Sequence, residues 1–318
     1  MKKLFLLTLL CFSYYSISAQ LIKRNFLSGY NANDVLEKGA YTSTTQDAST
    51  PIMIDQWNLA GKTGTNDQSG ENPKVIDPLY YTGYVESGVD FSINMLKLTT
   101  GGRTSIYSLD NASLYGAGTY YLALMINLTA ASLTSAADFV SFDGNYTGNA
   151  QRARITAKGV DDATFVLGMG DSGAASTFGT ALNYSQTYLA VVKITIDGAG
   201  AGTSWLYINP DLTATVPATA YATSGITGTA LKSLRGLVIR QRSTIAGQVG
   251  GFRFANTFAD AVGFKTGLSV LYSENAVRFS GKTIITDHPG KIQIYSLAGS
   301  EVLNAPTDGR FETSLTKG

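Results

Sequence analysis

Aromatic and aliphatic residues in this chain are gathered into short runs that end at Gly, Asn, Asp or Ser, and this pattern constrains the fold most. The run from Thr119 to Leu128 (TYYLALMINL) follows Gly116 and Gly118 and is followed by Thr129-Ala130-Ala131. Similar runs recur at short intervals, without the 3.6-residue period of an amphipathic helix between them. Many short strands separated by turn residues predict an all-β sandwich of two antiparallel sheets.

The segment Thr187 to Ile196 (TYLAVVKITI) is predicted to be a central strand. It is apolar on both faces apart from Lys193 and stops at Asp197-Gly198. A strand that is apolar on both faces suits a sheet covered on each side. Thr203 to Ile208 alternates instead, and Ser43 to Asp77 reads as long loops with isolated strands. Further strands are predicted at Asp138 to Phe142, Gln151 to Lys158, Thr164 to Leu167, Leu234 to Arg242 and Val249 to Ala255.

Composition and charge exclude several function classes. Charged residues are 15% of the 318 residues, against about 25% in an average soluble domain. The formal net charge is +1, so no basic surface is predicted that would attract nucleic acid or an anionic membrane. The chain has one His and one Cys. This inventory excludes zinc fingers, His-rich metal sites and Ser–His or Cys–His catalysis across most of the chain.

Residues 1–19 have the features of a secretory signal peptide. The basic pair Lys2-Lys3 precedes an apolar run from Leu4 to Phe12. Small residues between Ser16 and Ala19 then offer a cleavage site before Gln20. We therefore expect export of the chain, with a mature protein that begins after residue 19.

Neither a membrane span nor a lipid anchor is expected. The N-terminal apolar run is shorter than the ~20 residues that a membrane helix needs, and no later run is long enough. Leu10 before Cys11 is too bulky for a lipoprotein signal. Removal of the signal peptide also removes Cys11, so the mature chain can form no disulfide. The expected location is outside the cell or at its surface.

A series of short phrases lies in the middle of the chain, roughly between residues 75 and 262. The phrases are Leu79–Tyr84 with Ser87-Gly88, Gly102-Arg103, Gly118–Tyr121, Phe142–Gly144, Tyr188–Lys193, Trp205–Asp211, Ile239–Gln241 and Gly251–Phe254. Together and in this order they resemble the concanavalin-A-like, or laminin-G-like, jelly-roll domains of secreted Bacteroidetes proteins. The resemblance implies a jelly roll of two antiparallel sheets, one of them curved, whose concave face receives sugar in related lectins and glucanases.

In the C-terminal segment, Lys291 to Val302 reads KIQIYSLAGSEV, which predicts two short strands around the turn Ser296–Gly299. This segment resembles the sorting domain of type IX secretion substrates. Ser296 stands where the family usually has Asn, and the chain ends at Gly318 where the family continues into a final strand. We expect residues 20–264 to form the jelly-roll domain and 265–318 a truncated sorting domain, a small partial β-sandwich. The matching positions are Ile292, Ile294, Tyr295, Leu297, Gly299 and Val302.

Of three short motifs, one is present, one is present in part and one is absent, and the surrounding sequence does not support a nucleotide-binding or catalytic site at any of them. Gly168 to Gly173 spells G-x-G-x-x-G, but Ala174 to Tyr184 has no helical period, so we predict a loop between strands and no dinucleotide site. Gly61-Lys62-Thr63 resembles the end of a P-loop, but Gln56 occupies the position of its first Gly. No G-x-S-x-G is present, and His288 beside Pro289 is expected to be a solvated turn residue.

Paired carboxylates are the remaining route to catalysis. A retaining glycosidase needs two carboxyl groups ~5–5.5 Å apart. Glu37, Glu71 and Glu86 belong to no E-x-D-x-E-like cluster, and Asp161-Asp162 is expected to form a turn. An alginate-lyase-type site would need a His base, which is absent from this region. We therefore do not expect an enzyme, while remote residues that converge would support a polysaccharide hydrolase or lyase.

Aromatic and arginine side chains remain as candidates for ligand binding. Trp57 and Tyr146, with Trp205 and Tyr107, are residues that could stack on sugar rings. The pairs Arg152 with Arg154 and Arg240 with Arg242 are spaced to share one strand face, where they could hold an acidic polysaccharide bidentately. For each residue the competing interpretation is a core aromatic or a solvated Arg. The candidate ligand-binding residues are Trp57, Tyr146, Arg152, Arg154, Arg240 and Arg242.

No cofactor is expected, although a structural Ca²⁺ could use turn residues. Asp110, Asp143 and Asp197 lie in predicted turns, but no D-x-[DN]-x-[DN]-G loop is present.

The sequence thus favours a secreted or cell-surface lectin-like protein that binds polysaccharide or glycan without catalysis, in adhesion or substrate capture. Its other partner would be the type IX secretion machinery. A polysaccharide hydrolase or lyase on the same fold, and a structural surface-matrix protein without a small ligand, are the alternatives.

Overall fold

The computed structural model divides into two compact units, Met1–Phe264 and Lys265–Gly318. Among the described residues, no helix is long and apolar enough to cross a membrane. In the first unit the structure describes residues 21–37, 56–59, 71–95, 102–109, 115–144, 151–171, 177–217, 219–226 and 232–263. In the second it describes 277–280, 283–286, 290–295, 301–307 and 310–312.

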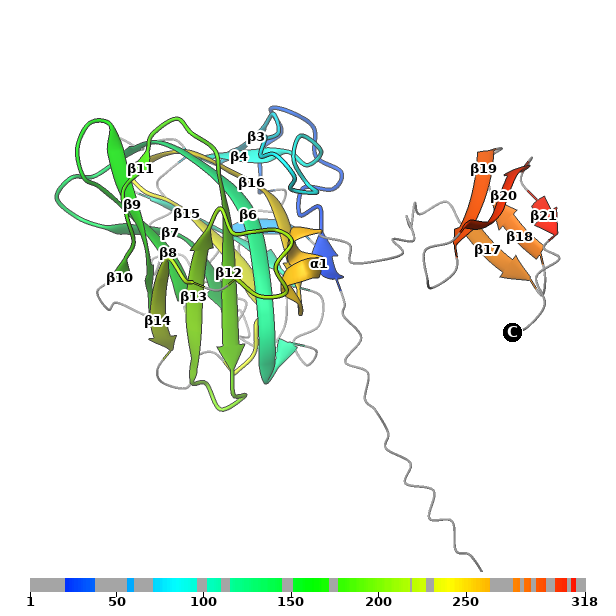
Figure 1. Ribbon diagram of the computed structural model, residues 1–318. Coiled ribbons are helices and arrows are strands. Elements are labelled where there is room, and N and C mark those ends of the chain that lie inside the picture. The colour runs from blue at the N-terminus through cyan, green and yellow to red at the C-terminus, as the bar shows by residue number, and fades with distance from the viewer. Residues whose placement is uncertain are drawn as a thin grey trace, which may run out of the picture. The chain divides into compact units, whose positions relative to one another are not determined.

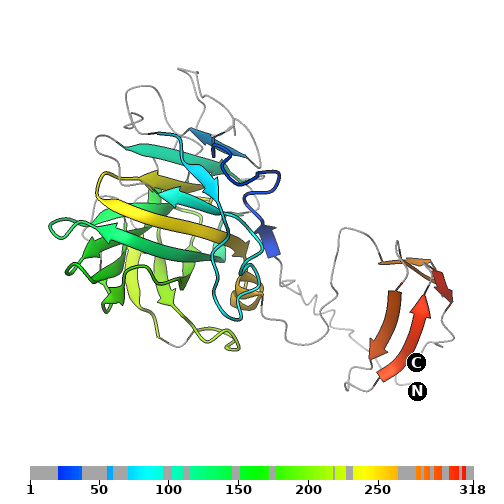
Figure 2. The same ribbon diagram turned by 90° about the horizontal axis from the view of Figure 1, so that it is seen from above.

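The first unit is a sandwich of two antiparallel eight-stranded sheets, seen as stacked layers in Figure 1 and from above in Figure 2. Sheet A contains, in spatial order, β14 (Ala222–Ile226), β13 (Gly202–Ile208), β12 (Tyr188–Ile196), β6 (Gly118–Ala131), β16 (Ile245–Ala255), β4 (Ser92–Met95) and β3 (Lys74–Ile76), with β1 (Leu21–Arg24) paired to β16.

Sheet B is the second layer. It contains, in spatial order, β10 (Thr177–Phe178), β9 (Thr164–Gly170), β8 (Gln151–Gly159), β7 (Ala137–Asp143), β15 (Gly236–Gln241), β5 (Arg103–Ser108) and β2 (Trp57–Leu59), with β11 (Leu182–Asn183) paired to β9. The prediction of a two-sheet antiparallel jelly-roll sandwich is confirmed. Each of the eight strand segments named from the sequence lies at a strand of the structure, with ends that shift by a few residues.

The main hydrophobic core lies between the sheets, and β6 shows how the alternation of side chains builds it. Leu122, Leu124 and Ile126 belong to this core, whereas the alternate positions Tyr121 and Met125 belong to a second cluster on the other face of sheet A. Successive side chains of a strand point to opposite faces, so one strand serves both clusters. Fully burying one such aliphatic side chain stabilises the fold by about 1.5–3 kcal/mol.

Part of the outer face of sheet A is covered by the chain itself. Helix α1 (Phe258–Val262) packs on β16 and β6, and its Phe258 and Val262 join the second cluster together with Leu79 and Tyr84. Thr257 caps the helix by accepting a hydrogen bond from the Asp260 N–H, and Gly263 ends it in the left-handed conformation with φ 71°. This cover explains why β12 is apolar on both faces, as the sequence predicted.

The second unit has two small sheets. β17 (Val277–Ser280), β18 (Thr283–Thr286) and β21 (Arg310–Glu312) form one, and β19 (Gly290–Tyr295) pairs with β20 (Glu301–Thr307) in the other. The two strands expected around the turn Ser296–Gly299 are therefore present. The turn itself lies outside the described residues.

Candidate functional site

The outer face of sheet B carries the charged residues that the sequence singled out. In β15, Leu237 and Ile239 belong to the core between the sheets, so the intervening Val238 and the next outward position, Arg240, lie on the outer face. Arg242 follows directly after β15. Arg154 comes from β8, and the intervening strand β7 contributes Asp138.

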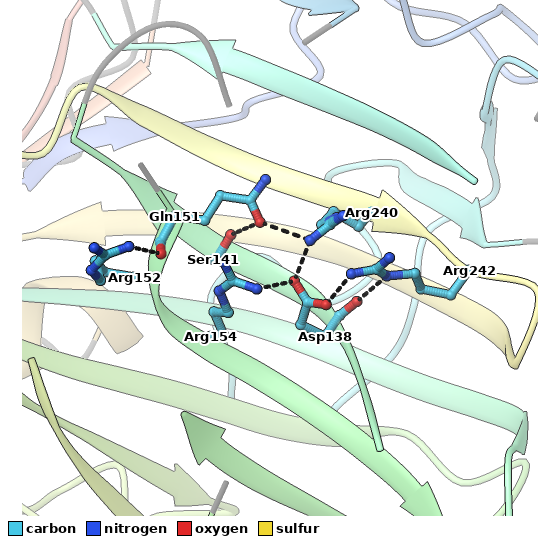
Figure 3. A network of polar contacts seen from close by, with 7 residues as sticks. All are labelled: Asp138, Ser141, Gln151, Arg152, Arg154, Arg240 and Arg242. Carbon is cyan, nitrogen blue, oxygen red and sulfur yellow. Dashed lines mark hydrogen bonds and ion pairs between the residues drawn. The ribbon is translucent and has the colours of Figure 1, made fainter. Parts of the chain in front are cut away.

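Three guanidinium groups converge on the carboxylate of Asp138 (Figure 3). Arg154 Nη1 lies 3.3 Å and Arg240 Nη1 3.0 Å from Asp138 Oδ2, while Arg242 Nη2 contacts Oδ1. Arg242 Nε also donates to the backbone carbonyl of Asp138 at 3.3 Å. We call these four residues the Asp138 cluster.

Neutral side chains extend the cluster along β8 and β7. Gln151 Oε1 accepts a hydrogen bond from Arg240 Nη1 at 3.3 Å and one from Ser141 Oγ at 3.4 Å. Gln151 and Ser141 are buried, each 2% exposed. Gln151 of β8 and Asp138 of β7 both accept from Arg240 Nη1, and Ser141 holds Gln151, so the cluster is held by several strands at once.

The electrostatics of the cluster favour bound negative charge. Burial raises the pKa of Asp138, but the charges of Arg240, Arg242 and Arg154 and the hydrogen bond from Arg242 lower it further, so its pKa lies below the ordinary value. Burial likewise lowers the pKa of Arg240, against the attraction of Asp138. Three guanidinium groups thus share one carboxylate in a partly desolvated place, where positive charge without a counter-ion is unfavourable.

A cavity of about 420 Å³ opens beside this cluster. Arg240, Arg242 and Asp138 line it together with Thr104 of β5, and its remaining lining residues are Gly102, Arg103, Ala136, Ala137, Gln241, Ser243 and Thr244. The Arg242 side chain is 31% exposed and is the most accessible of the three arginines. It uses Nε and Nη2 toward Asp138, and a guanidinium has five N–H donors, so further donors are available toward a ligand.

Arg103 on the cavity wall belongs to a separate ion pair. Glu37 is 6% exposed and accepts hydrogen bonds from Arg103 Nε and, at 2.7 Å, from Ser105 Oγ. Glu37 is one of the three Glu residues considered for catalysis, and its carboxylate is engaged by this arginine and this serine. The pair is charge-neutral, so the excess positive charge of the cavity comes from the Asp138 cluster.

The structure separates Arg152 from the other three candidate arginines. Its Nε lies 3.1 Å from Asp171 Oδ1, and its Nη1 donates to the Gln151 carbonyl at 2.8 Å. Figure 3 shows Arg152 pointing away from Asp138. The cause is a β-bulge: Phe142 pairs with Arg152 and Val140 with Ile155, so β8 has one extra residue. Ala153 within it takes φ 49°, and the predicted pairing of Arg152 with Arg154 on one strand face does not occur.

The aromatic candidates lie mostly in the core. Trp57 is 0% exposed, packs edge-on against Tyr107 at 5.4 Å between ring centroids, and donates its indole N–H to the Phe26 carbonyl. This burial corrects the interpretation of Trp57 as a sugar-stacking residue. Trp205 is half-buried on sheet A with Lys193 Nζ 4.7 Å from its ring centroid. Tyr146 lies outside the described residues.

The other carboxylates are engaged in structure or lie apart. Glu86 is buried and accepts a 2.7 Å bond from Arg253 Nη1, whereas Glu71 is exposed. Asp161 accepts the backbone N–H groups of Ala163 and Thr164, which confirms the predicted turn.

Asp197, one of the three residues considered for binding calcium, stabilises its own turn. Asp197 accepts three backbone N–H groups within its own turn, and these bonds lower its pKa. Asp143 is 0% exposed, and Asp110 lies outside the described residues. Across the part of the chain that the structure describes, no three His, Cys, Asp or Glu side chains lie together as metal ligands would.

The motif interpretations have mixed outcomes. Gly168 and Gly170 belong to β9, and the described part of the following segment contains the strands β10 and β11 and no helix. Gly61-Lys62-Thr63 and His288 lie outside the described residues. Sequence reasoning missed Asp138, Gln151 and Ser141 as parts of the site. The only signal was Asp138 itself, a charged residue at the start of a predicted strand.

No protein-family model matches the chain, and no curated protein matches its sequence. Similar solved structures include an endo-β-1,4-glucuronan lyase from the fungus Trichoderma reesei, at 7% identity over 67% of this chain and 100% of that one, with a TM-score of 0.41. A protein of unknown function from Shewanella oneidensis MR-1 is 10% identical over 74% of this chain and 89% of its own, with a TM-score of 0.36. The receptor-binding domain of botulinum neurotoxin type G is 10% identical over 61% of this chain and 46% of that one, with a TM-score of 0.32.

Proposed function

We propose that this protein is a secreted or cell-surface lectin-like protein that binds an acidic polysaccharide without cleaving it, in adhesion or substrate capture. The observation that carries the proposal is the convergence of Arg154, Arg240 and Arg242 on a single carboxylate beside an open cavity. A carboxylate or sulfate group of a polysaccharide supplies the negative charge that this arrangement lacks.

The chemistry of the guanidinium group supports this ligand class. Its planar N–H fork matches a carboxylate or sulfate bidentately, and charge-assisted hydrogen bonds are about twice as strong as neutral ones. Asp138 already orients all three arginines, so little side-chain freedom is lost when a ligand binds. The hydroxyl of Thr104, which also lines the cavity, adds a donor and acceptor for sugar hydroxyl groups.

The proposal is tested by affinity electrophoresis of the full chain in gels that contain polygalacturonate, with neutral dextran gels as reference. We expect retardation by polygalacturonate that weakens with added salt. Arg242→Ala should weaken the apparent affinity about tenfold or more. Lys158→Ala removes one positive charge from the same strand as Arg154 but outside the cavity lining, and should change the affinity less than twofold. Equal retardation of both variants and the wild type would refute the site.

The hydrolase or lyase alternative is tested on the same polymer. Prolonged incubation with the purified protein should leave the viscosity and the number of reducing ends unchanged. A fall in viscosity that Arg240→Ala abolishes would replace the binding proposal with an enzymatic one.

The proposed export route has two parts. Residues 1–19 act as a signal peptide, and residues 265–318 address the chain to the type IX secretion machinery. Mass spectrometry of the protein recovered from the medium of a producing strain should find Gln20 at the N-terminus. Retention of an otherwise folded chain without residues 265–318 inside the cell envelope would support the second part, and unchanged export would overturn it.

A further inference from the structure

A row of side-chain amides crosses the outer face of sheet A, away from the Asp138 cluster. Gln248 of β16 pairs in register with Asn94 of β4 on one side and with Asn127 of β6 on the other. These strands lie next to one another in Figure 1. Their sequence neighbours Ile93, Val249 and Ile126 belong to the core between the sheets, so the three amides share the outer face.

The amides keep most of their hydrogen-bonding capacity. All three side chains are half-buried. Asn127 Nδ2 donates to Thr187 Oγ1 at 3.2 Å, and Gln248 Oε1 lies 3.3 Å from Ser92 Oγ. Among the described residues, no hydrogen bond joins two of the three amides. Each amide has two donors and one acceptor oxygen, so the row still offers both kinds of group to a ligand.

A hollow of about 360 Å³ lies beside Gln248, the one amide of the row that lines it, and one of its walls is an exposed tyrosine. Gln248 and Thr187 line it together with Ile76, Asp77, Pro78, Leu79 and Tyr80. Tyr80 is 72% exposed. Its ring lies on Gly88, where an added Cβ would be 2.5 Å from the ring carbon Cε1. The backbone thus supports one side of the ring while most of the ring stays accessible.

Hydrogen bonds hold the segment that carries Tyr80 in place. The Gly88 N–H donates to the Leu79 carbonyl at 2.9 Å, and the Tyr81 N–H donates to Ser87 Oγ at 2.8 Å. Ser92 Oγ donates to the Asp77 carbonyl at 2.6 Å and so connects the segment to β4. A wall that is ordered before binding loses little entropy when a ligand arrives.

We propose that this hollow is a second binding site, specific for a neutral saccharide. An aromatic ring offers an apolar face to a sugar, while the Gln248 amide, the Thr187 hydroxyl and the Asp77 carboxylate match sugar hydroxyl groups as donors and acceptors. The lining contains no arginine or lysine among the described residues, and Asp77 repels an anionic ligand. The site therefore differs in chemistry from the Asp138 cluster on sheet B.

The test is isothermal titration calorimetry of the full chain with cellohexaose, xylohexaose and mannohexaose. We expect at least one of them to bind. Tyr80→Ala should weaken that binding about tenfold or more, Gln248→Ala about fivefold, and Tyr80→Phe, which keeps the ring, less than twofold. Val89→Ala is the matched control, because Val89 is also 72% exposed on the same segment but does not line the hollow. It should bind like the wild type.

Several results would overturn the proposal. These are an absence of binding to all three oligosaccharides, equal binding by Tyr80→Ala and the wild type, or capture of extended peptides at Tyr80 without any saccharide response. Arg242→Ala separates the two sites: it should lose polygalacturonate binding and keep neutral saccharide binding. Loss of both in this variant, with its thermal unfolding unchanged, would place all binding on sheet B.

Discussion

The outer faces of the two sheets are built on the same alternation of side chains but are covered differently. On sheet A, Tyr121 and Met125 point outward into an apolar cluster that Phe258 of α1 completes. On sheet B, the outward positions carry Asp138 and Arg240 beside a cavity. Where the chain supplies its own cover, the outer face is a second core, whereas beside the cavity of sheet B the outer face holds charged side chains.

Each face also has its own ionic network, and the two networks differ in their ratio of carboxyl to guanidinium groups. Beneath the cover of sheet A, Glu86 pairs with Arg253, and the nearby Asp90 is 3% exposed, with no hydrogen-bond partner for Oδ2 among the described residues. Burial, reinforced by the charge of Glu86, raises the pKa of Asp90 to about 7. Sheet A therefore has an excess of buried carboxyl groups, whereas the Asp138 cluster on sheet B has an excess of guanidinium groups.

The largest change in the free energy of unfolding is expected for a substitution on the covered part of sheet A. Phe258→Ala removes a side chain that is 1% exposed and leaves a void against Tyr121. We expect the free energy of unfolding to fall by about 3–5 kcal/mol in urea titrations. Phe178→Ala serves as the control, because Phe178 is 40% exposed. A loss for Phe258→Ala no larger than that of the control would mean that α1 contributes little to stability.

Asp90→Asn should raise the free energy of unfolding above neutral pH, by less than Phe258→Ala lowers it. Between its ordinary pKa of 3.8 and about 7, folded Asp90 keeps a proton that the unfolded chain releases, so stability falls as pH rises through this window. The variant, which cannot ionise, should be more stable than the wild type at pH 8 by at most about 4 kcal/mol. Near pH 4 the difference should vanish. A pH-independent difference in chemical denaturation would show that Asp90 does not titrate in this way.

The smallest change in the free energy of unfolding is expected for a substitution on sheet B. Asp138→Asn should lower the free energy of unfolding by about 2 kcal/mol at pH 7, because it removes the carboxylate that the three arginines share. The folded pKa of Asp138 is below its ordinary value, so its contribution is present above about pH 4 and is lost as pH falls further.

The polygalacturonate affinity of Asp138→Asn tests whether the carboxylate of Asp138 competes with the ligand. Removal of a negative charge from the site should leave polygalacturonate affinity unchanged or stronger, although the protein is less stable. Weaker affinity at a temperature where the variant is fully folded would show that Asp138 contributes to binding by orienting the arginines more than it competes with the ligand.

Much of the sandwich follows from the sequence because burial sets the pattern of each strand. The run that became β12 is apolar on both faces, and the structure places Leu189 and Val191 under the α1 cluster and Ala190 and Val192 in the core between the sheets. The hairpin of β12 and β13 likewise follows from the turn at Asp197-Gly198. Local residue types suffice for such elements, because pairing partners are neighbours along the chain.

The candidate site was only partly predictable, because it depends on register between strands distant in sequence. Arg154 and Arg240 are 86 positions apart in the printed sequence, and only the insertion of β7 between β8 and β15 brings both to Asp138. The burial of Trp57 was not predicted for a similar reason. Trp57 lies in the segment Ser43 to Asp77, which the sequence predicts as long loops with isolated strands, but β2 pairs with β5 and places the indole in the core.

The bulge at Ala153 decides which side chains of β8 reach the outer face of sheet B. Gln151 and Arg154 are three positions apart and would point to opposite faces of a regular strand, but the extra residue between them lets Gln151 contact Arg240 and Arg154 contact Asp138. Without the bulge, the same residues would slip by one position and one of these two side chains would face the core. Strand length at this position therefore controls the polar surface of sheet B as directly as the choice of side chains does.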